Sequence, residues 1–187
     1  MSEANASKGQ TKMILYEDIL RAFQKRDVQY VIVGGIAFNL LGGERNTLDL
    51  DILVEMTDGN LRKIITILKK AGYHAKQPVD PMLIADKKTR EDWTKNKHMK
   101  AFNFYKGEST YEEVDIIIDS PLDFKGAIKD AVKAKIRGLT LVVISPKNFI
   151  RMKKKSGRDV DLRDIAELKL VRGVRQCLNG KVREKRY

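Results

Sequence analysis

The chain is poor in the residues that build disulfides, zinc sites and thiol-based active sites. Its 187 residues include one cysteine, Cys177, and two histidines, His74 and His98. A lone cysteine cannot form an internal disulfide, and these three side chains cannot make the usual zinc sites or a Cys–His nucleophile pair. The P-loop and dinucleotide-binding fingerprints, G-x-x-x-x-G-K-[ST] and G-x-G-x-x-G, are absent too, so those two fold classes lack support.

Long hydrophobic runs are also missing. Stretches such as 30–33 and 139–144 are far shorter than the roughly 20 apolar residues that cross a bilayer. Residues 1–12 are polar and lack the apolar centre of a signal peptide. Together with the single cysteine, these absences predict a cytoplasmic protein with no membrane partner.

Acidic residues are outnumbered by basic ones. The chain has 37 Lys and Arg against 25 Asp and Glu, which gives a net charge of +12. Such an excess attracts phosphate-bearing partners at long range. This positive charge is compatible with three kinds of partner, a nucleoside triphosphate, RNA or an acidic protein. It is also compatible with a basic surface that is merely well solvated. Hydrophobic residues, at 42%, are frequent enough for a folded core, and the length suits one domain.

Alternating helical and strand-like patterns predict one α/β (α+β) domain over residues 13–171. Expected helices cover 16–25, 36–41, 60–71, 122–133, 146–155 and 158–171, and expected strands cover 30–33, 48–54, 100–105, 111–118 and 139–144. Residues 106–110 suit a hairpin between two of these strands, and the charged stretch 86–97 fits a surface loop or a helix. This order indicates a mixed central sheet flanked by helices, with further helices at the C-terminal end. A disordered tail is expected over 1–12 and a basic tail over 172–187.

Two aspartates interrupt an otherwise apolar, strand-like run. Aspartate is depleted in strands, yet the stretch 48–54 contains both Asp49 and Asp51. Residues i and i+2 of a strand project from the same face, so the two carboxylates point together, which is costly unless a cation neutralises them. Such a pair suits Mg²⁺ or Mn²⁺, because these ions typically bind one or two carboxylates plus nucleotide phosphates. The alternative is an edge strand whose aspartates simply face water.

A glycine pair stands between a strand and a helix just ahead of these aspartates. Gly34 and Gly35 follow the apolar stretch 30–33 and open the next expected helix. Glycines let backbone N–H groups approach phosphate closely, and a helix N-terminus adds partial positive charge. The pair therefore predicts a phosphate-binding turn, with an ordinary strand-to-helix turn as the alternative.

A third carboxylate lies in another β-branched stretch. Asp115 is embedded in the expected strand 111–118, and Asp119 shares its face but stands at the strand end. Asp115 is therefore the first candidate, and Asp119 the second, to complete a three-carboxylate metal site. In such a site one carboxylate acts as general base on an acceptor hydroxyl, while metal ions clamp the attacking and leaving oxygens.

The order of these motifs resembles the DNA polymerase β-like nucleotidyltransferase superfamily, whose pattern is hG[GS]…DhD…D. The residues that carry the resemblance are Val33, Gly34, Gly35, Arg45, Thr47, Asp49, Asp51 and Asp115. The run 150–165 is similar to the closing helices of small bacterial and archaeal members, including antitoxin-type proteins. The resemblance extends over roughly residues 14–171, and the helical substrate domain of larger members is missing.

The resemblance implies transfer of a nucleoside monophosphate from a nucleoside triphosphate to a hydroxyl of a protein, an RNA or a small molecule. It implies that Asp49, Asp51 and Asp115 are the catalytic residues and the ligands of Mg²⁺ or Mn²⁺, and that Gly34 and Gly35 hold the triphosphate. The acceptor stays open, because the substrate domain that would indicate it is missing.

Further residues are candidates for binding the nucleotide. Arg45 is expected either to reach the triphosphate or to be an ordinary surface side chain. Thr47 is expected to hydrogen-bond near the metal or to support the strand. Lys153 is another candidate phosphate ligand, although 153–155 fits a solvated face better. An ion-pair set that supports a helix is expected from residues at helical spacing, namely Arg158, Asp161 and Asp164.

A binding module is the alternative to an enzyme. An antitoxin-like or RNA-binding protein that retains this fold with little catalysis also fits the basic charge and the basic segment 172–187, and it would have a toxin partner or an RNA. Nucleic-acid affinity that falls steeply with salt distinguishes this alternative.

Overall fold

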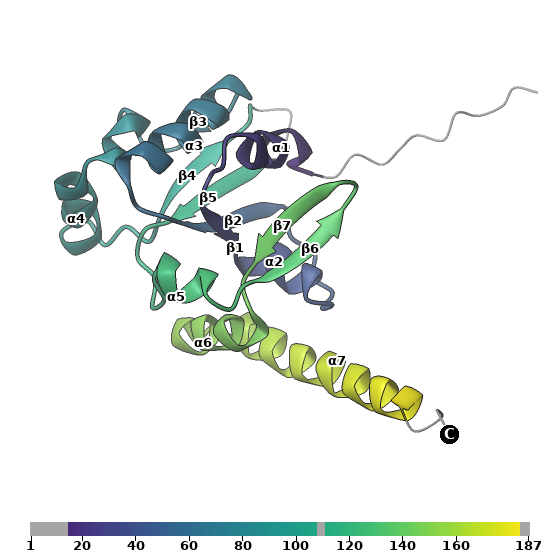
Figure 1. The fold of residues 1–187 in the computed structure, drawn as a ribbon. Helices are drawn as coiled ribbons and strands as arrows, with labels where there is room; N and C mark the ends of the chain where they lie inside the picture. Colours follow the sequence, from purple (N-terminus) through teal and green to yellow (C-terminus); the bar gives the residue numbers. More distant parts are fainter. Residues whose placement is uncertain (1–14, 108–110, 184–187) are drawn as a thin grey trace, which may run out of the picture.

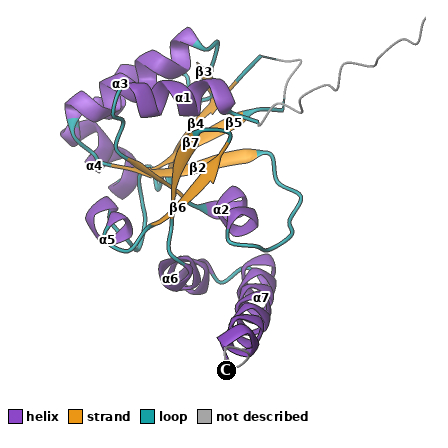
Figure 2. Ribbon diagram, turned by 45° about the vertical axis from the view of Figure 1, so that its right-hand side comes forward, coloured by secondary structure: helices purple, strands orange, loops and turns teal. Residues whose placement is uncertain are grey.

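Residues 15–107 and 111–183, which are those that the computed structural model describes, form a seven-stranded sheet with helices on both faces (Figures 1 and 2). This confirms the predicted mixed α/β architecture. The tail expected over 1–12 lies outside the described residues. Among the described residues, none of the helices has both the length and the apolar character needed to cross a membrane.

The sheet is mixed, with the strand order β3-β4-β5-β2-β1-β7-β6. Its strands are β1 (Tyr30–Ile32), β2 (Asp49–Val54), β3 (His74–Ala75), β4 (Ala101–Tyr105), β5 (Glu113–Ile117), β6 (Val132–Ile136) and β7 (Leu139–Val143). The β2–β5 and β1–β7 pairs are parallel, and the other neighbours are antiparallel. The antiparallel pairing of β4 with β5 confirms the predicted hairpin.

Helices cover the sheet in two groups. They are α1 (Glu17–Lys25), α2 (Gly34–Leu40), α3 (Asp58–Lys70), α4 (Lys87–Lys95), α5 (Phe124–Ile128), α6 (Pro146–Ser156) and α7 (Asp159–Arg183), with a 3-10 helix η1 (Pro81–Ala85). In both views α1 and α3 lie on one face, α2 and α5 lie on the other, and α6 and α7 lie beyond that second group (Figures 1 and 2). The second group therefore packs near the strands that carry the aspartates, since α2 contacts β2 and α5 contacts β1 and β2.

Strand β2 joins the apolar core to the polar site. Leu50 and Ile52 are fully buried on one face of the strand, and burying each such side chain contributes on the order of 2 kcal/mol. On the opposite face Asp49 is exposed and Asp51 is partly buried. The predicted common face of the two aspartates is confirmed, because the strand alternates side chains as expected.

The prediction of one helix over 122–133 is wrong. Helix α5 ends at Ile128 and β6 follows, forming a hairpin with β7 in which Ile136 pairs with Leu139. The two-residue turn has positive φ at both Arg137 (47°) and Gly138 (77°), the backbone that tight hairpins require. Lys133 and Lys135 alternate with apolar residues along β6, which is a strand pattern. Because lysine is also a good helix former, the segment was predicted to be a helix.

Other boundaries differ from the sequence-based expectation. Of the two alternatives for the charged stretch 86–97, a surface loop or a helix, the structure has the helix, α4. It begins there because the side chain of Asp86 accepts a hydrogen bond from the backbone N–H of Thr89. The final helix was expected to end at residue 171, yet α7 continues to Arg183 and takes in most of the segment predicted to be a basic tail. Extra elements not predicted are the short strand β3 and η1.

Candidate active site

The pairing of β2 with β5 brings the three aspartates together. The parallel register places Asp51 beside Asp115 and Asp49 beside Glu113. Neighbouring strands lie about 4.8 Å apart, and cross-strand partners project from the same face. Asp49, two residues before Asp51, shares that face. All three predicted carboxylates therefore meet on one side of the sheet.

Burial and mutual repulsion perturb these carboxyl groups. Partial burial raises the pKa of Asp51 to about 6, helped by the charges of Asp115 and Asp49 and opposed by Lys153 and Arg45. Burial also raises the pKa of Asp115, and the charge of Asp49 adds to the effect. A site in which like charges crowd together is one that a cation stabilises.

The glycine pair provides space for the side chains of β2 and of the loop before it. A Cβ atom at Gly34, whose φ is +63°, would lie 1.8 Å from Oδ2 of Asp51. A Cβ at Gly35 would lie 2.6 Å from Oγ1 of Thr47. Both glycines are therefore required for close packing against Asp51 and Thr47, a reason that the strand-to-helix pattern alone did not indicate.

Lys153 belongs to a buried ionic cluster that joins α6 to α7. Its side chain is 7% exposed, and its Nζ lies 2.6 Å from Oδ1 of Asp161 and 2.7 Å from Oδ2 of Asp164. Arg158 pairs with Asp161 at 2.9 Å, and Arg45 pairs with Asp164 at 3.1 Å. The expectation that Lys153 lies on a solvated face is wrong, because the buried acids that neutralise it come from the following helix.

The cluster behaves as a tightly bonded unit. Burial opposes ionisation of Asp161, yet hydrogen bonds from Arg158 and Lys153 hold its pKa well below the usual range. The predicted ion pairing of Arg158 with Asp161 is thus confirmed, whereas Asp164 pairs with Lys153 and Arg45 instead. The loop that carries Arg45 is fixed as well, because Asn39 bonds both its backbone N–H and its carbonyl at 2.8 Å. This arrangement keeps the charges of Arg45 and Lys153 close enough to act on Asp51.

A cavity of about 630 Å³ opens in front of Asp51 and Asp115. Its wall includes Gly34, Asp51 and Asp115 from the sheet side, Lys153 from α6, and Arg158 from the connection between α6 and α7. Small-molecule sites commonly have volumes of about 300–1,000 Å³. The space is therefore large enough for a nucleotide or a comparable ligand.

The second candidate for a third carboxylate, Asp119, lies elsewhere on the cavity wall. Its Oδ2 pairs with Nζ of Lys100 at 2.5 Å. It stands beyond the end of β5, four residues after Asp115, which is on the order of 13 Å along an extended chain. The register of β5 with β2 thus favours Asp115 over Asp119 as the neighbour of Asp51.

Two polar residues that the sequence did not single out support Asp115. Nδ2 of Asn103, on β4, donates to Oδ1 of Asp115 at 2.7 Å. Gln77 donates from Nε2 to Oδ1 of Asn103 at 2.8 Å and accepts from the backbone N–H of Asn103 at 3.2 Å. Asparagine, like aspartate, is depleted in strands, so the position of Asn103 between Phe102 and Phe104 was the available signal.

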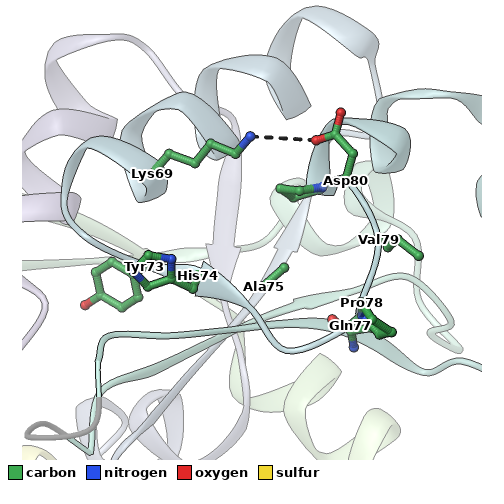
Figure 3. Close-up of a pocket in the computed structure, with 9 residues that line it drawn as sticks. Lys69, Tyr73, His74, Ala75, Gln77, Pro78, Val79 and Asp80 are labelled. Carbon is green, nitrogen blue, oxygen red and sulfur yellow. Dashed lines mark ion pairs between the residues drawn. The ribbon is translucent and has the colours of Figure 1, made fainter.

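Gln77 also lines a second cleft, of about 620 Å³, at the β3 edge of the sheet (Figure 3). Figure 3 shows Lys69 and Asp80 facing each other across it, with their side chains 3.7 Å apart. None of the aspartates, glycines and basic residues predicted for the site lines this cleft. The chemistry is therefore concentrated in the cavity in front of Asp51 and Asp115.

The donor set of the cavity fits a hard divalent ion that shares its ligands with a nucleotide. In the part of the chain that the structure describes, no three His, Cys, Asp or Glu side chains form a ready cage for a metal. Mg²⁺ rarely uses such a cage, because it is usually bound by one or two carboxylates together with phosphates and water. The adjacent carboxylates of Asp51 and Asp115, with Asp49 nearby, meet that requirement.

Comparisons with known proteins identify the family and the fold. The aminoglycoside-2''-adenylyltransferase family model matches residues 16–168. The structure of ANT(2'')-Ia in complex with adenylyl-2''-tobramycin has a TM-score of 0.53 at 16% identity, covering 92% of this chain and 97% of that chain. The lincomycin-bound lincosamide antibiotic adenylyltransferase LnuA has a TM-score of 0.52 at 19% identity, covering 81% and 92%. These structures share the fold. No curated protein matches the chain in sequence.

Proposed function

Since this chain belongs to the aminoglycoside-2''-adenylyltransferase family, and is therefore a nucleotidyltransferase, we propose that it transfers a nucleoside monophosphate from a nucleoside triphosphate to a hydroxyl of a small molecule. One observation carries the proposal: Asp51 and Asp115 stand side by side on parallel strands, with Asp49 on the same face, in front of a ligand-sized cavity. The relatives support a small-molecule acceptor, since ANT(2'')-Ia is named with an adenylylated tobramycin and LnuA with lincomycin. Neither name points to an RNA or to a toxin partner.

In the proposed reaction the acceptor oxygen attacks the α-phosphorus of the triphosphate. The bond from that phosphorus to the oxygen of the β-phosphate breaks, and pyrophosphate leaves. The hydroxyl proton passes to a carboxylate, and we assign this role to Asp115, which lines the cavity beside Asp51. The hydrogen bond from Asn103 to Oδ1 keeps that carboxylate in one orientation.

The three aspartates would hold the metal. Asp49, Asp51 and Asp115 would bind Mg²⁺ or Mn²⁺, and their mutual repulsion would be relieved by its charge. When bound, such an ion supplies positive charge at the attacking and leaving oxygens. This chemistry explains why carboxylates occupy strand positions that would otherwise be apolar.

The triphosphate would lie between the glycine turn and the basic side chains. Gly34 lines the cavity, and the space beside Gly34 and Gly35 is filled by the side chains of Asp51 and Thr47. Arg45 and Lys153 act electrostatically on Asp51, so their charges reach the space in front of it. Each is also paired with Asp164, which fixes its position. We assign these residues to nucleotide binding.

An adduct assay tests the proposal. The purified protein is incubated with Mg²⁺ or Mn²⁺, each nucleoside triphosphate and a panel of small hydroxylated compounds, and mass spectrometry detects acceptors heavier by one nucleoside monophosphate. We expect a metal-dependent adduct whose formation falls by more than about 100-fold in Asp51→Asn and Asp115→Asn. Asp92→Asn, on the remote helix α4, serves as the control and should retain activity. Adduct formation in excess chelator, or full activity in both site variants, would exclude the proposed mechanism.

A further inference from the structure

A buried tyrosine lies at the start of the two strands that carry the aspartates. Tyr16 immediately precedes α1 and is 4% exposed. Its hydroxyl donates to the carbonyl of Leu48 and accepts from the backbone N–H of Glu113 at 2.9 Å. The carbonyl of Glu113 is a second acceptor, at 2.8 Å. One phenol therefore connects the residue before Asp49 to the residue two before Asp115.

Strand β2 is bonded on one side alone at this end. Among the described residues, backbone bonds from β1 and its continuation reach β2 no further than Asp51, whose carbonyl accepts from Val33 at 2.9 Å. Asp49 lies beyond these bonds, and its partner in the ladder is Glu113 on β5. The backbone position of Asp49 thus depends on the connection to β5, which Tyr16 reinforces.

The backbone of Tyr16 is in a conformation that other contacts must maintain. Its φ of 66° lies in the left-handed region, which is uncommon for a residue with a side chain. Such a conformation persists when the surrounding structure determines it. The bonds from the hydroxyl to Leu48 and Glu113 are contacts of that kind.

The hydroxyl has a role that the ring alone cannot fill. A phenylalanine would occupy the same space in the core, whereas a buried phenol is costly unless it is hydrogen-bonded. Burial raises the pKa of Tyr16 well above its usual range, and the charge of Asp49 adds to the effect. The hydroxyl is therefore protonated, and able to donate, at neutral pH.

A second buried tyrosine shows what the first one adds. Tyr73 donates its hydroxyl to the carboxylate of Glu112, the residue just before β5. This bond joins the segment after α3 to the approach of β5. Both phenols thus anchor the start of β5, whereas the bonds of Tyr16 also extend to the residue that leads into β2.

From these contacts we infer that Tyr16 is a positioning residue for the metal site: its hydroxyl holds the start of β2 against β5 and so keeps Asp49 beside the other two aspartates. The inference rests on the proposed nucleotidyl transfer, which assigns the three carboxylates to the metal. Groups that orient metal ligands without touching the metal typically change metal affinity by about 10–100-fold when they are removed. Loss of the hydroxyl should therefore weaken metal binding while the fold persists.

The metal dependence of nucleotide binding tests this role without relying on turnover. The affinity for a fluorescent, non-hydrolysable nucleoside triphosphate is measured at a series of free Mn²⁺ concentrations. We expect Tyr16→Phe to need about tenfold more Mn²⁺ than the native chain for half-maximal binding, and to reach the native nucleotide affinity at saturating Mn²⁺. Tyr73→Phe is the matched control, because it also loses a phenol bond at the start of β5, and it should keep the native Mn²⁺ dependence. Circular dichroism and thermal unfolding establish that both variants are folded.

The possible outcomes separate the two proposals. If the native chain shows no Mn²⁺-dependent nucleotide binding, the proposed function fails and the inference falls with it. If the native chain responds to Mn²⁺, an unchanged Mn²⁺ dependence in Tyr16→Phe overturns the inference alone. Equal shifts in Tyr16→Phe and Tyr73→Phe also overturn it, because they indicate a general loosening of β5.

The native protein provides a second measurement if Tyr16→Phe unfolds. The backbone N–H of Glu113 bonds to Tyr16, so its hydrogen exchange, followed by NMR, should slow by about tenfold when Mg²⁺ and the nucleotide bind. An unchanged exchange rate would overturn the inference, since it would show that the metal site and the bond to Tyr16 are not coupled.

Discussion

Asn103 holds one oxygen of Asp115 across the β4–β5 pair, with 2.7 Å between Nδ2 and Oδ1. Gln77 in turn holds the amide of Asn103 in the orientation that makes this donation, by accepting from its backbone and donating to its side-chain oxygen. Two neutral residues, Asn103 and Gln77, therefore fix the orientation of the Asp115 carboxylate, which is proposed to receive the acceptor's proton. Neutral donors can orient a base without adding charge to the site.

Asn103→Ala is expected to raise the pKa of Asp115. The hydrogen bond from Asn103 favours the ionised carboxylate, so its loss leaves burial and the charge of Asp49 less opposed. Carboxyl ¹³C NMR titration, with the signal assigned from Asp115→Asn, measures the shift directly. The acidic limb of the pH–rate profile should move to higher pH in parallel. Asn96→Ala, at the C-cap of α4, is the control. An unchanged Asp115 titration in Asn103→Ala would refute the positioning role.

Asp51→Asn is expected to stabilise the folded protein at pH 7. The carboxyl pKa rises from 3.8 to about 6 on folding, so the folded state binds the proton more tightly than the unfolded chain. The protonated Asp51 carboxyl therefore contributes to the free energy of unfolding below about pH 4, and this contribution is lost as the pH rises through about 6. The amide should therefore add about 1–3 kcal/mol to the free energy of unfolding at pH 7 and little at pH 4. Urea unfolding at both pH values measures this, and an equal gain at the two would contradict it.

The limits of sequence-based prediction follow from which contacts are local. Strand parity placed Asp49 and Asp51 on one face, because that depends only on residues two apart. Asp115 was selected because it is embedded in a β-branched stretch and does not stand at its end. The pairing of β2 with β5, which brings it beside Asp51, joins segments far apart in the chain and was not predicted. Lys153 was assigned to solvent from its lysine neighbours, whereas its burial depends on acids of the next helix. Long-range partners were thus the main source of error.

Gly34→Ala is expected to reduce metal-dependent nucleotide binding as well as stability. The new Cβ would overlap Oδ2 of Asp51, and an alanine at positive φ costs about 1 kcal/mol in addition. Gly72→Ala is a close control, because Gly72 also has a positive φ, 84°, but a Cβ there meets nothing within 4 Å. Both variants should lose stability in thermal unfolding. Calorimetry should show that Gly34→Ala alone loses nucleotide affinity, and equal affinities in the two would argue against the contact with Asp51.

Lys153→Met is expected to destabilise the protein strongly and to change the titration of Asp51. Removing the amine leaves Arg158 and Arg45 as the charged partners of Asp161 and Asp164, and breaking a buried ion pair costs about 3–5 kcal/mol.

The second effect separates an electrostatic role from a purely structural one. The charge of Lys153 lowers the pKa of Asp51, so its loss should raise that pKa further, as carboxyl NMR would show. Lys154→Met, the exposed neighbour, should alter neither quantity. If Lys153→Met unfolds too readily for NMR, Lys153→Arg keeps the charge and should retain most of the stability with little change at Asp51. A raised Asp51 pKa in Lys153→Arg would show that geometry rather than charge links α6 to the aspartates.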